Sequence, residues 1–344
     1  MKVLIIKTSS LGDVIHTLPA LTDAGRFIAG IQFDWVVEQA FAEVPTWHPL
    51  VHKVIPVALR RWRKQAFLAL KSGEWRIFRE QLQAEKYDYI IDAQGLIKSA
   101  FLTYFSQGLR CGLNWKSAWE PLASLAYQQK YAVEPEQHAV VRIRQLFSQV
   151  LNYSMPNALA DYGIDRAQLA HTNTQMPYVV LLHGTTWPTK HWPEIYWQQL
   201  AKQIAALGLA IKIPWGNLTE HQRAQRIAQD IPQAEVLPKL NLAGVASVLA
   251  GAKACVAVDT GLGHLAAALK VPTLSLYGPT NPNLTGTMGS YQQHLMAKFS
   301  CAPCLQKKCD YTGLREIEPP CFGQLNPPLV LQQLQQLIAS TAEI

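Results

Sequence analysis

The sequence predicts an α/β protein made of two doubly wound, Rossmann-like domains that face a cleft. Short apolar runs alternate with longer amphipathic stretches, which is typical of a parallel sheet with helices on its faces. The pattern stops in a polar segment near the middle of the chain and then begins again. At 344 residues, the chain is long enough for two domains with separate cores.

In the first half, the apolar runs VLIIK, FDWVV and YDYIIDAQ predict buried strands. Amphipathic periodicity predicts helices between and after them, over residues 13–28, 65–84 and 96–105. Residues 152–176 are rich in Asn, Ser, Pro, Asp and Gly and predict the interdomain linker. The first domain is therefore expected over residues 1–155.

The second half is expected to form its own domain over residues 156–326. A helix is predicted over residues 193–207, after the first of five strands. The strands are predicted from the runs YVVLLH, AIKIPWG, AEVLP, ACVAVD and TLSLYG. The tail at residues 327–344 is amphipathic, and we expect it to pack back on the first domain.

Composition limits the classes of partner. Thirty-one basic and 24 acidic side chains give a formal charge of +7, which favours a nucleotide, a phosphorylated lipid or a nucleic acid. No nucleic-acid-binding signature accompanies this charge, so no nucleic-acid partner is expected. No apolar run approaches the length of a membrane span, and no signal peptide is indicated.

The stretch CVAVDTGLGHLAAAL joins a predicted buried strand to a helix rich in small residues. Helix N-termini bind phosphate, and Gly261 and Gly263 would let a pyrophosphate approach the backbone. The alternative is an ordinary turn capped by Asp259 or Thr260. His264, on the following helix, is interpreted as structural more readily than as catalytic. The spacing matches neither a dinucleotide fingerprint nor a P-loop.

Two further loops follow predicted strands of the second half. LLHGTTWPTKHWP supplies two hydroxyls and a cation, Thr185, Thr186 and Lys190, where doubly wound sheets bind ligands. A solvated loop with a surface lysine is the alternative. IPWGNLTE adds Glu220 as a hydrogen-bond acceptor for a ribose, or as a solvated glutamate at a helix start.

The stretch RRWRK places four cations around one tryptophan, Arg60, Arg61, Arg63 and Lys64. These side chains would bind phosphates or lie on an anionic membrane surface. A basic surface helix without a partner is the third interpretation.

The spacing of four cysteines is compatible with a structural metal site but does not require one. Cys301, Cys304, Cys309 and Cys321 form C-x2-C-x4-C-x11-C, and paired cysteines can build a zinc site. Since the second pair is spaced unlike a zinc ribbon, free thiols are the preferred interpretation. Cys111 and Cys255 are isolated and are expected to be packing residues.

The opening KTSSLGDVIHTLPAL carries an acid, Asp13, in a strand-to-helix turn where a phosphate cradle would have none. A carboxylate there would accept a proton from an attacking hydroxyl as a general base. It would equally serve as an N-terminal cap of the first helix. The residues alone do not choose between the two roles.

The motifs together resemble one family. KTSSLGDVIHTLPAL, RRWRK, DAQGLIKSA, TKHWP, PWG and DTGLGHLAAAL occur in the order found in the type I lipopolysaccharide heptosyltransferases, over residues 1 to about 285. The resemblance implies the GT-B fold and no metal or other cofactor. It also implies inverting transfer of L-glycero-D-manno-heptose from ADP-heptose to the Kdo of Kdo2-lipid A.

The resemblance assigns roles by motif position. Asp13 would be the base, and Ser9, Ser10 and the RRWRK cations would bind the acceptor in the first domain. The second domain would bind the donor. Its binding residues would be Thr185, Thr186, Lys190, Glu220, Leu240, Asp259, Thr260, Gly261, Gly263 and His264. The protein would be a monomer that is cytoplasmic and peripheral on the inner face of the inner membrane.

Three other functions stay open. The cysteine-rich segment 301–321 resembles related heptosyltransferases, which leaves transfer of the second heptose, by a heptosyltransferase II, as an alternative. A sugar-nucleotide epimerase of GT-B type would need more cleft carboxylates than Asp13 alone. A nucleotide-binding scaffold without activity would keep the glycine turns and RRWRK and would not need Asp13.

Overall fold

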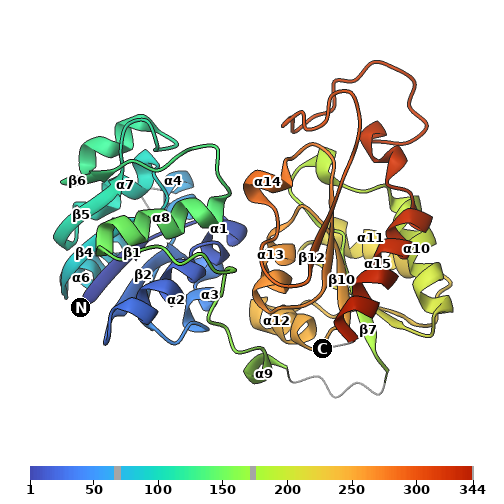
Figure 1. Cartoon of the computed structure of the whole chain (residues 1–344), viewed down its shortest axis with the longest axis horizontal. Helices are drawn as coiled ribbons and strands as arrows, with labels where there is room; N and C mark the ends of the chain where they lie inside the picture. The colour runs from blue at the N-terminus through green and yellow to red at the C-terminus, as the bar shows by residue number, and fades with distance from the viewer. Residues whose placement is uncertain (66–70, 171–175, 343–344) are drawn as a thin grey trace. The chain divides into compact units, whose positions relative to one another are not determined.

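The computed structural model describes residues 1–65, 71–170 and 176–342, which form two compact α/β units (Figure 1). Unit 1 runs from Met1 to Ile164, and unit 2 begins at Asp165. The predicted boundary after residue 155 therefore falls too early. Residues beyond it belong to unit 1 because Arg144 donates to the Pro156 and Ala158 carbonyl oxygens and Arg26 pairs with Asp161 at 2.7 Å.

Unit 1 is built on a six-stranded parallel sheet in the order β3-β2-β1-β4-β5-β6. The strands are β1 (Lys2–Ile6), β2 (Gln32–Glu38), β3 (Val51–Val57), β4 (Lys86–Asp92), β5 (Gln107–Leu113) and β6 (Gln129–Tyr131). The predicted first three apolar runs form β1, β2 and β4. Three strands, β3, β5 and β6, were not predicted; β5 contains Arg110 and two glycines, and β6 is only three residues long.

Helices cover both faces of this sheet because successive strand residues point to opposite sides. The helices are α1 (Leu11–Ile15), α2 (Leu18–Phe27), η1 (Gln39–Phe41), α3 (Glu43–Thr46), α4 (Leu59–Lys64), α6 (Glu74–Gln83), α7 (Ile97–Thr103), η2 (Pro121–Ala126) and α8 (Ala139–Leu151). Leu4 and Ile6 pack toward α6 through Phe78 and Leu82. On the other face α2 packs with α8, which crosses the sheet in Figure 1.

Two predicted helices of unit 1 are interrupted. The helix expected over residues 13–28 is divided into α1 and α2, because Pro19 opens the first turn of α2. The helix expected over residues 65–84 is observed as α6, which begins after Gly73 in the left-handed conformation. Residues 66–70 of that prediction lie outside the described residues.

Unit 2 repeats the architecture with a parallel sheet in the order β12-β11-β10-β7-β8-β9. Its strands are β7 (Tyr178–Leu182), β8 (Ala210–Ile213), β9 (Ala234–Val236), β10 (Ala254–Val258), β11 (Thr273–Tyr277) and β12 (Gln292–Met296). Its helices are α9 (Arg166–Leu169), η3 (Pro188–Lys190), α10 (Glu194–Ala206), α11 (Leu218–Ala228), α12 (Leu242–Ala250), α13 (Gly261–Ala268), α14 (Pro282–Thr285), η4 (Pro320–Gln324) and α15 (Pro327–Ala342). All five predicted strands are present, and β12 was missed.

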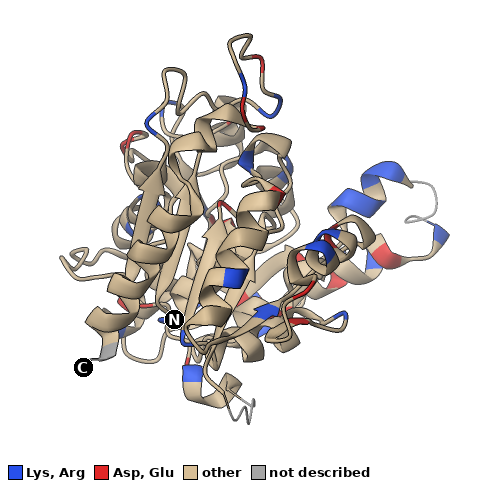
Figure 2. Cartoon of the chain, turned by 90° about the vertical axis from the view of Figure 1, so that its right-hand side faces the viewer, with Lys and Arg blue, Asp and Glu red and all other residues tan. Residues whose placement is uncertain are grey.

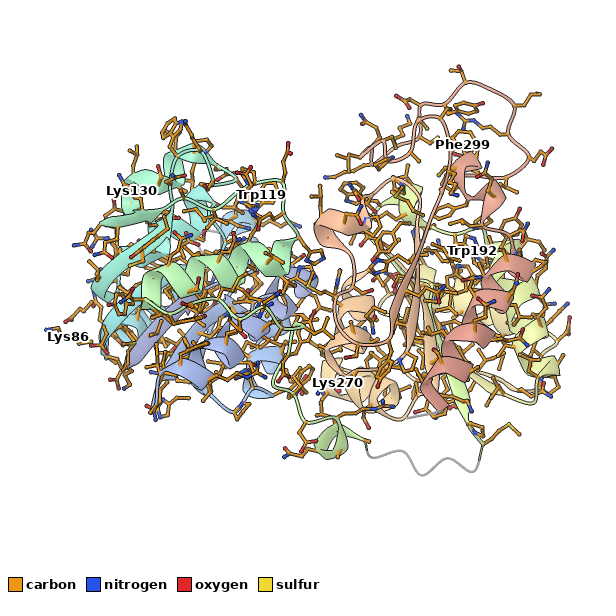
Figure 3. All side chains as sticks on the ribbon, in the orientation of Figure 1. Lys86, Trp119, Lys130, Trp192, Lys270 and Phe299 are labelled. Atoms are coloured by element: carbon orange, nitrogen blue, oxygen red, sulfur yellow. The ribbon has the colours of Figure 1, made fainter. Side chains whose placement is uncertain are left out.

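The C-terminal helix α15 packs on unit 2, so the prediction that it returns to the first domain is wrong. Val330, Leu334 and Leu337 share one helix face and are buried in the core of unit 2, against α10, β10 and β11 (Figure 1). Trp192 belongs to the same core (Figure 3), and its indole Nε1 donates to the Leu325 carbonyl oxygen at 2.8 Å. The apolar face of α15 is therefore buried against other elements of unit 2.

No helix among the described residues is both long enough and apolar enough to cross a bilayer. In each parallel sheet all strands end at the same edge, and the loops that follow them gather there.

Candidate functional site

In unit 1 the loop after β1 carries the acid at residue 13. Asp13 lies in the first turn of α1, and its Oδ2 accepts hydrogen bonds from Ser10 N at 2.7 Å and Ser10 Oγ at 2.8 Å. This is the capping role considered from the sequence. The side chain nevertheless stays 45% exposed, and its Oδ1 faces the Lys7 ammonium at 3.9 Å. A carboxylate held in this way is oriented by one oxygen while its side chain stays accessible to solvent.

Lys7 is a residue of this site that sequence reasoning missed. It is 5% exposed, and its Nζ donates to the Ala93 carbonyl oxygen at 3.0 Å. Burial lowers the pKa of the Lys7 ammonium, while the carboxylates of Asp13 and Asp92 act in the opposite direction. A lysine directly after a buried apolar strand was the signal that could have identified it.

A buried network behind the loop fixes its position. Gln94 Oε1 accepts from both Thr8 N and Thr8 Oγ1 at 2.8 Å. Asp92, at the end of β4, accepts from Tyr127 OH at 2.6 Å, from Ser99 Oγ at 2.8 Å and from the Gln94 backbone N. Burial raises the pKa of the Asp92 carboxyl against these hydrogen bonds. Satisfied buried networks of this kind rigidify the segments that they join.

The basic helix α4 follows β3, so it begins at the same sheet edge as the Asp13 loop. Glu38 Oε1, at the end of β2, accepts from the Arg60 backbone N at 3.1 Å. Arg61 makes a bidentate ion pair with Glu74, at 2.8 and 2.7 Å. Lys and Arg gather on α4 (Figure 2). Within the predicted cluster Arg61 is thus paired with Glu74, and all four cations, Arg60, Arg61, Arg63 and Lys64, are exposed.

In unit 2 three of the predicted donor-site residues meet at the carboxyl ends of β7 and β10. Lys190 Nζ lies 2.7 Å from Asp259 Oδ2, with the side chains only 16% and 9% exposed. Thr185 Oγ1 donates to the Asp259 carbonyl oxygen at 2.9 Å. Thr280, which follows β11 and was missed, donates to Asp259 Oδ2 at 2.7 Å. An ammonium has three donors, so Lys190 can serve Asp259 and an anionic ligand together.

A second cation approaches this cluster from a remote segment. The Nζ atoms of Lys190 and Lys307 lie 4.4 and 5.5 Å from the Trp187 ring centroid. Thr189 Oγ1 donates to the Gln306 carbonyl oxygen at 2.6 Å, and Leu305 N donates to the Pro279 carbonyl oxygen at 2.8 Å. Residues 305–307 are therefore attached to the loops after β7 and β11. No local pattern in the sequence signals this contact.

Glu220 comes close to the loop after β7. Its Oε2 accepts from Gly216 N at 2.7 Å, and its carboxyl group lies against Gly184 so closely that a Cβ there would be 3.0 Å from it. Asn217 caps α11 through Glu220 N. The carboxylate predicted to bind a ribose thus lies against the loop that begins with His183 and leads to Lys190.

The histidines of this loop are neutral. His183 is fully buried, and burial together with the nearby Arg223 guanidinium lowers its pKa to about 3. Burial and Arg223 also lower the pKa of His191, whose Nδ1 lies 2.8 Å from Arg223 Nη1. At neutral pH the positive charge of this loop therefore comes from Lys190.

The remaining predicted donor residues are spread over several elements. Thr260 is the N-cap residue of α13, with an extended backbone, and Gly261 and Gly263 form the first turn. His264 is buried within that helix, as a structural histidine would be. Thr186 is exposed, and Leu240 is half-buried against Gly244 in the first turn of α12.

The four cysteines of the segment 301–321 are free thiols in the structure. Among the described residues, no group of three or more His, Cys, Asp and Glu side chains is placed to hold a metal ion. All six cysteines are free thiols, with Cys301 exposed and Cys321 buried. The metal site considered for these four cysteines is therefore not formed in the structure.

Unit 2 offers a cation and hydroxyl groups at a sheet edge, which suits a nucleoside diphosphate. Unit 1 offers an accessible, oriented carboxylate and a basic helix at its own sheet edge. Taken separately, the groups of unit 2 can bind an anionic leaving group, and the carboxylate of unit 1 can take a proton from a nucleophile.

Comparison with known proteins identifies relatives over nearly the whole chain. The sequence profile of glycosyltransferase family 9 (heptosyltransferase) matches residues 75–315. Lipopolysaccharide heptosyltransferase 1 of Pseudomonas aeruginosa is 57% identical, with 98% of each chain covered.

Solved structures agree with this similarity. A heptosyltransferase of Escherichia coli bound to ADP superposes with a TM-score of 0.88 at 48% identity, covering 98% of this chain and 100% of the other. The E. coli structure with ADP-2-deoxy-2-fluoro heptose gives 0.84 at 47% identity, covering 98% and 99%. The predicted fold class, two doubly wound domains of GT-B type, is confirmed by these matches.

Proposed function

This chain belongs to glycosyltransferase family 9, the heptosyltransferases, and on that premise we propose that it transfers L-glycero-D-manno-heptose from ADP-heptose to Kdo2-lipid A. The acceptor atom would be a hydroxyl oxygen of the Kdo, in the lipopolysaccharide inner core. The observation that carries the proposal is the cluster of Lys190, Asp259 and Thr185 at one sheet edge. The relatives named for the first heptose transfer favour this reaction over the second.

The donor would bind on unit 2. Lys190 and the hydroxyls of Thr185 and Thr186 would hold the diphosphate, with the turn from Asp259 to Gly263 around the sugar and pyrophosphate. Glu220 would accept a hydrogen bond from the ribose, and Leu240 would lie beside the adenine. The E. coli relatives bound to ADP and to a fluorinated ADP-heptose support a donor of this class.

The reaction would be a single displacement at the anomeric carbon. The acceptor hydroxyl oxygen forms the new bond while the bond from the anomeric carbon to the phosphate oxygen breaks, and ADP leaves. Asp13 takes the hydroxyl proton, and Lys190 stabilises the charge that develops on the leaving phosphate. Because nucleophile and leaving group lie on opposite faces of the sugar, the configuration inverts.

The first test measures ADP release from ADP-heptose with and without a Kdo-bearing lipid A acceptor. ADP release that depends on the acceptor supports the proposed transferase. An acceptor that already carries one heptose should then give no release if the enzyme transfers the first heptose, and release if it transfers the second. No release with any heptose donor would contradict the proposal and favour a nucleotide-binding scaffold. Turnover of a UDP-sugar without acceptor would indicate an epimerase.

The exposed cations of α4 are proposed to bind acceptor phosphates. Replacing Arg63 and Lys64 together with alanine is expected to raise the KM for the lipid acceptor by about tenfold, with the KM for ADP-heptose unchanged. The matched control replaces Lys53 and Lys86 with alanine, which removes two charges near the amino ends of β3 and β4. Steady-state kinetics with each substrate varied in turn makes the measurement, and an equal effect in both double variants would refute a specific role for α4.

Lys307 is proposed as a second cation for the donor diphosphate. Lys307→Ala is expected to weaken ADP binding by about three- to tenfold and AMP binding by less, because AMP lacks the second phosphate that this cation is proposed to bind. Calorimetric titration with ADP, AMP and adenosine measures this, with Lys298→Ala as a control in the same segment. If the ratio of the dissociation constants for ADP and AMP is the same in the variant as in the wild type, Lys307 only packs on Trp187.

A further inference from the structure

Helix α7 presents an apolar stripe to solvent. Ile97, Phe101 and Tyr104 are spaced by four and three residues, so they lie on one side of the helix and its C-cap. Their exposed fractions are 50%, 52% and 55%. Large apolar side chains gathered on one exposed helix face are unlike the single exposed ones that occur on most surfaces.

The neighbouring helix η2 has the same property. Leu122 and Leu125 are three residues apart, which is one turn of a 3₁₀-helix, and they are 56% and 65% exposed. Trp119, a further three residues earlier, is 66% exposed and lies at the surface of unit 1 in Figure 3. We call these six side chains, which lie on α7 and its C-cap, on η2, and at residue 119 before η2, the α7–η2 face.

Between α7 and η2 small side chains are buried and large apolar side chains are exposed, whereas a protein core normally buries the large ones. The helices pack on each other, and the residues buried at this contact are Ala100, Ala123, Ala126 and Tyr127. Three of the four are alanines, so the small side chains lie inside and the large apolar ones outside. Such an arrangement leaves apolar area that folding of the chain alone does not bury.

The excess of basic side chains around the α7–η2 face indicates a partner with negative charge. Between residues 97 and 131 the chain has four basic side chains and a single acid, Glu120. The Glu120 carboxylate accepts from Ile97 N at 2.6 Å, so it is occupied at the start of α7. The Arg110 guanidinium lies 4.8 Å from the Tyr104 ring, and Arg142 lies 5.0 Å from the Trp119 ring. Aliphatic, aromatic and basic side chains in one face are the composition that membrane interfaces favour.

The face is continuous with the two acceptor-side features of unit 1. Phe101 stacks on Trp75 at 6.4 Å between ring centroids, and Trp75 contacts Trp62 of the basic helix α4 at 5.8 Å. At the start of α7, Lys98 Nζ donates to Ser9 Oγ at 3.4 Å, in the loop that carries Asp13. A lipid held against the α7–η2 face would therefore lie beside the Asp13 loop.

We propose that the α7–η2 face inserts into the headgroup region of an anionic lipid bilayer and so brings a lipid-borne acceptor to the Asp13 loop. This inference rests on the proposed transferase function for the identity of the acceptor.

The test compares two triple variants in the full-length protein. Phe101→Ser, Leu122→Ser and Leu125→Ser remove apolar side chains from the face. Phe27→Ser, Leu159→Ser and Leu314→Ser are the matched control, since Phe27 is also 52% exposed and also stacked on an aromatic ring, and the leucines are 71% and 98% exposed. Co-sedimentation with vesicles of phosphatidylglycerol and phosphatidylethanolamine measures binding, and thermal unfolding shows that each variant is folded.

We expect the face variant to lose at least about tenfold in vesicle partition and the control to keep the wild-type value. Wild-type binding should also fall on vesicles of phosphatidylcholine alone, which lack the negative charge. Equal partition of both triple variants would overturn the proposal. So would a change from dimer to monomer in the face variant with vesicle binding intact, since the face would then bind a second copy of the chain.

Activity separates this inference from the function on which it rests. The face variant should lose transfer to an acceptor in vesicles but keep transfer to the same acceptor in detergent micelles. If the wild-type protein binds vesicles through the α7–η2 face but transfers no heptose, the proposed function is contradicted and the membrane-binding role of the face is still supported.

Discussion

Replacing Asp13 with asparagine is expected to lower the rate of heptosyl transfer by about 10²–10⁴-fold, with ADP binding unchanged. The amide keeps the shape of the carboxylate, and its Oδ1 can still accept the hydrogen bond from Ser10 N that caps α1. What the variant loses is the ability to take the acceptor proton. Single-turnover transfer with saturating donor and acceptor measures the chemical step, and calorimetry with ADP checks the donor site.

The control for Asp13→Asn is the same substitution at another aspartate that caps a helix but lies outside the proposed site. Asp165 caps α9 by accepting from Ala167 N at 2.9 Å, so Asp165→Asn makes the same chemical change at a helix start. It is expected to leave the transfer rate within a factor of about two. Asp13→Asn with wild-type turnover would return Asp13 to a purely structural role and leave the transferase proposal standing.

Lys190→Ala is expected to weaken ADP binding by about 30- to 100-fold, since charge-assisted hydrogen bonds contribute roughly 1.5–3 kcal/mol each. The same change leaves the carboxylate of Asp259 without its ammonium partner and is expected to lower the free energy of unfolding by about 3 kcal/mol. Titration with ADP and chemical denaturation measure the two effects separately.

Unit 2 supplies a matched control in Lys212. Its side chain is 13% exposed, its Nζ lies 4.4 Å from the Tyr178 ring centroid, and it pairs with Glu235 at 4.0 Å. Lys190 has the same surroundings in kind, a carboxylate and an aromatic ring. Lys212→Ala should therefore destabilise unit 2 without weakening ADP binding, and an equal loss of ADP affinity in both variants would contradict a phosphate role for Lys190.

Most residues of the proposed site could be predicted as candidates because they depend on local patterns. A buried apolar run followed by polar residues marks the carboxyl end of a parallel strand, and ligands bind there. Asp13, Lys190 and Asp259 were found in this way. The same reasoning missed Lys7 and Thr280, whose importance depends on which loops lie side by side.

Long-range contacts account for what was missed or wrong. The amphipathic pattern of α15 shows that one face is buried, but it is the same pattern whichever domain receives that face. Lys307 reaches Trp187 because residues 305–307 attach to the loops after β7 and β11. Contacts of this kind have no periodicity along the chain and so leave no local signal.

The α/β class, the two domains, and the acid and cations at strand ends could be predicted from the amino-acid sequence, because side-chain periodicity and turn chemistry act within a few residues. The pairing of Lys190 with Asp259, the place of α15 in unit 2, and the exposure of large apolar side chains on α7 and η2 were visible only in the folded chain. Each of these depends on which segments pack together. Strand order and helix docking fix that choice through the burial of apolar area over the whole unit.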